Sequence, residues 1–90
     1  MSRHELPAEG GLEVVVGWDP PMQTFFASVL DRTLRGEDPD YTKVWIGFAS
    51  TAILDPRRVC DAVRPYAKEI PDWILPALHA DALEAPGVLW

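Results

Sequence analysis

Residues 12–30 read LEVVVGWDPPMQTFFASVL, and the two halves of this stretch follow different apolar patterns. Leu12–Trp18 is a short valine-rich run, typical of a strand whose two faces are both covered. Asp19 and Pro20 then look like a helix start, because aspartate caps helices and proline fits their first turn. Helical spacing follows, with Gly36 as a stop, at Met22, Phe25, Phe26, Val29 and Leu30. We therefore predict a strand followed by a helix that begins at Pro20.

A second apolar run, KVWIGFA at Lys43–Ala49, predicts another strand. Strict alternation would put Val44, Ile46 and Phe48 on one face and Trp45 on the other. Both runs carry a glycine just before their end, Gly17 and Gly47, where we expect a neighbouring backbone to approach closely.

Two further helices are predicted downstream. Asp55 and Pro56 repeat the pattern of Asp19 and Pro20, so a helix should begin at Pro56. Pro65 should end it near Arg64, because proline removes a helical hydrogen bond and clashes with the preceding turn. A third helix is expected from about Asp72 to Leu83.

The resulting order, strand-helix-strand-helix-helix, predicts a small α/β (or α+β) domain in which a right-handed crossover joins two parallel strands. Residues 1–11 mix charge with Pro7 and two glycines and are expected to be a mobile leader to a single globular domain over residues 12–90. A two-stranded sheet is marginal in water. We therefore expect the apolar tail at residues 87–90 or a second copy, in a homodimer, to extend it.

Composition excludes several function classes. The chain has 90 residues, 48% of them hydrophobic, and a net charge of −6. Such acidity disfavours binding to nucleic acid. We interpret the basic side chains between residues 57 and 68 as a solvated helix face: Arg57, Arg58, Arg64 and Lys68. The N-terminus lacks an apolar signal region and no run suits a membrane span, so a cytoplasmic location without membrane contact is expected.

The sequence contains no catalytic motif. His4, His79 and Cys60 have no partners at metal-ligand spacing, so we predict no catalytic residues, no metal and no cofactor. Cys60 is interpreted as a small, semi-buried apolar residue, since no activating group is near it in sequence. His79 is interpreted as a surface histidine.

One candidate binding site can be constructed at the carboxyl ends of the two predicted strands, where ligands gather in α/β units. It would contain Trp18, Asp19, Phe48, Ser50 and Thr51. Helix capping alone accounts for Asp19, and we prefer that explanation.

The four tryptophans favour a different function. Large aromatic side chains anchor protein interfaces, so Trp45, Trp73 and Trp90 are candidate interface residues. We predict a non-enzymatic protein-binding or regulatory module whose partner is another protein or a second copy of the chain. The alternative is a small-molecule-binding domain, or a minor enzyme, with its pocket at the strand ends.

The segment GWDPPMQTFF at Gly17–Phe26 resembles a segment found in short bacterial proteins of unknown role. The shared pattern is Gly-Trp-Asp, a proline, then Gln-Thr-Phe-Phe. This resemblance implies a bacterial origin and a small self-contained domain. It implies no activity, cofactor or site residue.

Overall fold

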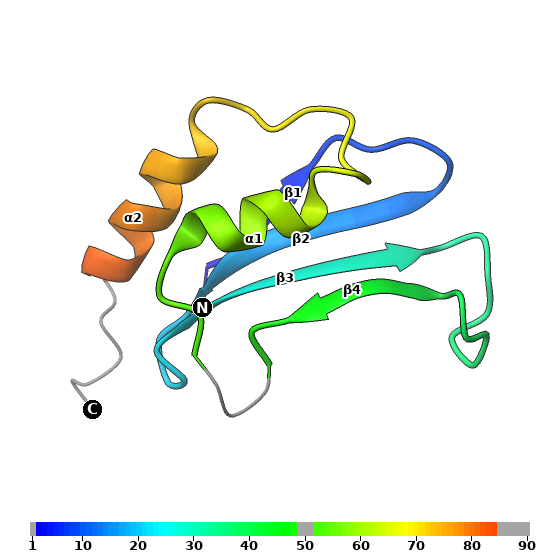
Figure 1. The fold of residues 1–90 in the computed structure, drawn as a ribbon, viewed down its shortest axis with the longest axis horizontal. Coiled ribbons are helices and arrows are strands. Elements are labelled where there is room, and N and C mark those ends of the chain that lie inside the picture. Colours follow the sequence, from blue (N-terminus) through cyan, green and yellow to red (C-terminus); the bar gives the residue numbers. More distant parts are fainter. Residues whose placement is uncertain (1, 49–51, 85–90) are drawn as a thin grey trace.

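The computed structural model describes residues 2–48 and 52–84, which form a four-stranded sheet followed by two helices (Figure 1). The strands are β1 (His4–Leu6), β2 (Leu12–Asp19), β3 (Thr24–Asp31) and β4 (Thr42–Ile46). They pair antiparallel in the order β1-β2-β3-β4, so that each strand lies beside its neighbour in sequence. The helices are α1 (Pro56–Val63) and α2 (Ile74–Glu84).

The predicted order of strands and helices, and the two-stranded sheet, are wrong. Residues 24–31, predicted as helix, form β3 and pair along their whole length with β2. Because β3 lies between β2 and β4, those two strands do not pair and there is no parallel crossover between them. β1 lies within the segment expected to be a mobile leader. The apolar tail expected to extend the sheet lies outside the described residues.

The helix prediction failed because two periodicities coincide in β3. Every residue from Thr24 to Val29 is buried, so the apolar positions fit a helical stripe as well as a strand covered on both faces. The backbone is extended here, so that Phe25, Ala27 and Val29 lie in the core beneath the helices. Phe26 and Ser28 alternate with them and occupy the opposite face.

Asp19 closes a turn between β2 and β3 and does not cap a helix. The Met22 N–H donates to Asp19 Oδ1 at 3.4 Å, and the Gln23 N–H donates to the Pro20 carbonyl oxygen at 3.1 Å. Gln23 has a left-handed φ of 51°, which helical backbone excludes. Pro20 and Pro21 suit this turn, because proline fixes φ near the value that turn positions require.

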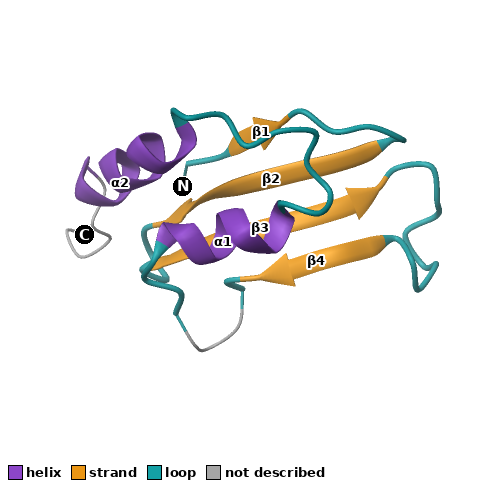
Figure 2. Cartoon of the chain, turned by 45° about the horizontal axis from the view of Figure 1, so that its top comes forward, coloured by secondary structure: helices purple, strands orange, loops and turns teal. Residues whose placement is uncertain are grey.

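The core lies between one face of the sheet and both helices, and α1 crosses that face over β3 (Figure 2). β2 and β3 contribute Val14, Val16, Trp18, Phe25, Ala27 and Val29. The helices contribute Val59, Cys60, Val63, Ile74 and Leu78. All of these side chains are at most 6% exposed.

The two downstream helices confirm the sequence predictions. Asp55 caps α1, accepting a hydrogen bond from the Arg57 N–H at 3.0 Å, and Pro56 occupies the first turn. α1 ends at Val63, before Pro65. α2 covers most of the range predicted for the third helix and begins at Ile74.

A buried threonine joins the sheet to the segment that leads into α1. The Thr24 hydroxyl accepts from the Ile53 N–H at 2.8 Å and donates to the Phe25 carbonyl at 2.9 Å. The Phe25 N–H in turn donates to the Ile53 carbonyl at 2.9 Å. These bonds fix the start of β3 against the segment that leads into α1.

Neither of the described helices is long and apolar enough to cross a membrane.

Candidate functional site

The candidate site is the sheet face that α1 and α2 leave uncovered, which we call the open face. It carries the alternate side chains of the strands, and the register places Val15, Ser28 and Trp45 side by side across β2, β3 and β4. Val15 and Ser28 are at most 6% exposed. The open face is therefore packed at its centre although neither described helix covers it.

Three aromatic rings pack on the open face and form what we call the aromatic cluster: Phe26, Trp45 and Phe48. The Trp45 and Phe48 rings are stacked, with centroids 4.1 Å apart and an interplanar angle of 20°. The Phe48 and Phe26 centroids are 5.3 Å apart. Phe26 is 3% exposed, whereas Phe48 is 37% and Trp45 57% exposed. The cluster thus has a buried base and an exposed upper pair.

Gly47 brings Phe48 onto this face. Its φ of +84° breaks the strand alternation, so Phe48 lies with Trp45. The prediction that Phe48 shares a face with Val44 and Ile46 is therefore wrong. A Cβ at Gly47 would collide with the Phe25 carbonyl oxygen and lie 2.6 Å from Phe26 Cα. The close backbone approach predicted at Gly47 is confirmed.

Gly17 makes room for the base of the aromatic cluster. It lies opposite Phe26 in the β2–β3 register. A Cβ at Gly17 would lie 2.6 Å from Phe26 Cζ and collide with the Ser2 carbonyl oxygen. The close approach predicted here is also confirmed, and it lets the Phe26 ring lie over the sheet backbone.

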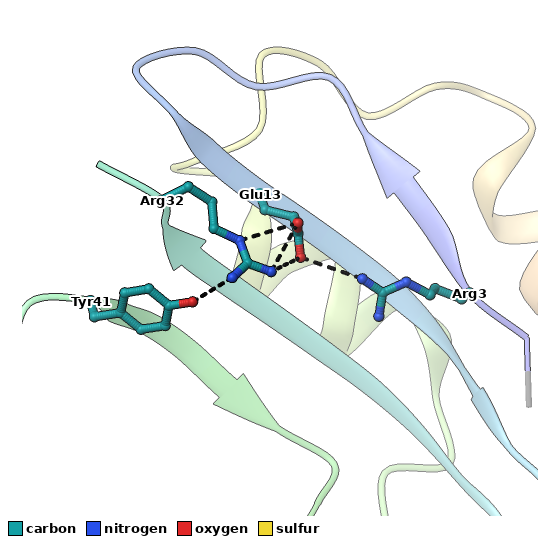
Figure 3. A network of polar contacts seen from close by, with 4 residues as sticks. All are labelled: Arg3, Glu13, Arg32 and Tyr41. Atoms are coloured by element: carbon teal, nitrogen blue, oxygen red, sulfur yellow. Dashed lines mark hydrogen bonds and ion pairs between the residues drawn. The ribbon is translucent and has the colours of Figure 1, made fainter. Parts of the chain in front are cut away.

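Polar side chains cluster elsewhere on the open face, around Glu13 of β2 (Figure 3). The guanidinium groups of Arg3 and Arg32 approach the Glu13 carboxylate from two sides, with shortest nitrogen–oxygen distances of 3.3 and 3.0 Å. Arg32 also donates to the Tyr41 hydroxyl at 2.5 Å. The hydrogen bonds from Arg32 are the main reason that the pKa of Glu13 lies below its ordinary value.

Arg3 connects the β1 edge of the open face to the polar cluster. The next residue, His4, pairs with Val16 of β2, and the Arg3 guanidinium lies 3.3 Å from Glu13 Oε1, nearer the start of the same strand. Val15, between these two positions on β2, pairs with Glu5 and is 0% exposed.

The open face is balanced in charge where the strand register fixes the side chains. Arg3 and Arg32 lie on it together with Glu5 and Glu13. The regular pairing is interrupted at Lys43, which lies between Val44, the partner of Val29, and Thr42, the partner of Leu30.

The outer edge of β4 is poorly suited to adding a further strand. β4 has five residues, carries Lys43, and departs from regular pairing between Val29 and Leu30 of β3. Short length, lysine and bulges are features that prevent edge pairing. A partner of the open face would thus contact its side chains.

Of the five candidate binding residues at the strand ends, the three that the structure describes do not come together as one site. Trp18 is buried in the core, with its ring centroid 4.8 Å from that of Phe25. Asp19 is in the β2–β3 turn. Phe48 lies on the opposite face from Trp18. Ser50 and Thr51 lie outside the described residues.

Two candidate interface residues are exposed. Trp45 belongs to the aromatic cluster, and Trp73, which precedes α2, is 53% exposed. The Trp73 ring packs edge-on against His4 at 5.9 Å, and His4 Nε2 lies 2.6 Å from Asp81 Oδ2. These contacts link β1 to α2 and position Trp73. Trp90 lies outside the described residues.

The remaining residues singled out in the sequence are placed as follows. Cys60 is buried, and burial raises the pKa of its thiol. His79 is exposed on α2. Arg57, Arg64 and Lys68 form exposed ion pairs with Asp55, Asp61 and Glu9, respectively.

Sequence reasoning missed Phe26 and the polar cluster around Glu13. The helical spacing predicts Phe26 on a helix stripe, whereas the residue lies on the open face of β3. The available signal for the polar cluster was an isolated glutamate at the start of an otherwise apolar strand, which requires a basic partner when it is partly buried.

Residues 2–48 and 52–84 contain no cavity and no group of three side chains that could hold a metal ion. No protein-family model matches the chain, and neither a curated protein nor a solved structure matches it.

Proposed function

We propose that the chain is a non-enzymatic module that binds another protein through the open face and can thereby regulate that protein. The observation that carries this proposal is the exposed, stacked pair Trp45 and Phe48. Aromatic side chains that are partly exposed and held by well-packed neighbours are the commonest anchors of protein interfaces.

The arrangement around the pair supports binding at low entropic cost. Phe48 rests on the buried Phe26 ring, and Gly47 fixes the direction from which Phe48 approaches Trp45. Binding would therefore cost little side-chain entropy at Trp45 and Phe48, because their packing already restricts them. The charged groups around Glu13 supply a polar surface on the same face, as interface rims commonly do.

The test is co-purification from the native host with matched variants. Trp45→Ser removes the exposed anchor, and Leu54→Ser is the control, because Leu54 is 73% exposed and lies outside the aromatic cluster. We expect the wild-type chain and Leu54→Ser to retain the same stoichiometric partner and Trp45→Ser to lose it. Circular dichroism must show that both variants keep the fold. Retention of every partner by folded Trp45→Ser would refute the proposal.

A further inference from the structure

We draw no further inference here: the strongest candidate, the exposed surface patch around the Trp73 ring where it packs against His4 at the β1 edge of the sheet, carries nothing, because nothing in the part of the chain that the structure describes shows what covers it.

Discussion

Gly47→Ala is the substitution that should damage the open face most specifically. Gly47 has a φ of +84°, and an added Cβ would collide with the Phe25 carbonyl oxygen and lie 2.6 Å from Phe26 Cα. Left-handed backbone costs an L-residue about 1–2 kcal/mol. Forcing an extra carbon against packed neighbours costs about 1–3 kcal/mol more. The free energy of unfolding should therefore fall by about 2–5 kcal/mol in total.

Thermal unfolding followed by circular dichroism measures this loss. For a domain of this size each kcal/mol lowers Tm by about 4–8 °C, so Gly47→Ala should lower it by at least about 8 °C. The matched control is Gly36→Ala, because no atom lies within 4 Å of an added Cβ there and φ is not left-handed. Gly36→Ala should leave Tm unchanged or raise it slightly. If the two variants unfold at the same temperature, the assigned backbone at Gly47, and with it the placement of Phe48, is incorrect.

Three further predictions concern groups that hold the sheet and core together. Thr24→Val keeps the side-chain shape but leaves the buried Ile53 N–H without its acceptor, so urea titration should show a loss of about 1–3 kcal/mol, whereas Thr24→Ser should retain the hydrogen bond and most of the stability. The pKa of Glu13 is lowered, so its ionised carboxylate stabilises the fold at pH values above its ordinary pKa of 4.5, and this stabilisation disappears as the pH falls through the lowered pKa. The free energy of unfolding of the wild type should therefore exceed that of Glu13→Gln by about 0.5–1 kcal/mol at pH 7 and equal it near pH 2. A difference that persists in acid would contradict the ion-pair origin. Cys60 is buried with a raised thiol pKa, so a disulfide reagent should react with the native chain far more slowly than with the urea-unfolded chain; equal rates would place the thiol at the surface.

The parts of the fold that were predictable depend on local chemistry. β2 follows from a continuous apolar run, and α1 follows from an aspartate cap, a first-turn proline and Pro65 beyond its end. In each case neighbouring residues decide the backbone, so a short window of sequence suffices.

The parts that were not predictable depend on contacts distant in sequence. β3 is buried on both faces, and only its pairing with β2 distinguishes it from a helix with the same apolar positions. β1 has three residues and no apolar pattern, and it forms because β2 offers it a partner. Trp45 was predictable as an interface candidate because a tryptophan alternates with apolar neighbours there. Its stacking with Phe48 was not, because the alternation rule takes no account of a left-handed glycine.

Site-specific photo-cross-linking in the native host tests most directly whether the open face is the binding surface. A photoreactive phenylalanine analogue replaces Trp45 or Phe48 on the open face, or, as controls, Leu54 or Arg58, which are exposed and lie outside the aromatic cluster. We expect discrete protein adducts from positions 45 and 48, to a second copy or to another protein, and none of these adducts from positions 54 and 58. Adducts confined to positions 54 and 58, or no adduct at 45 and 48 in a folded chain, would contradict it.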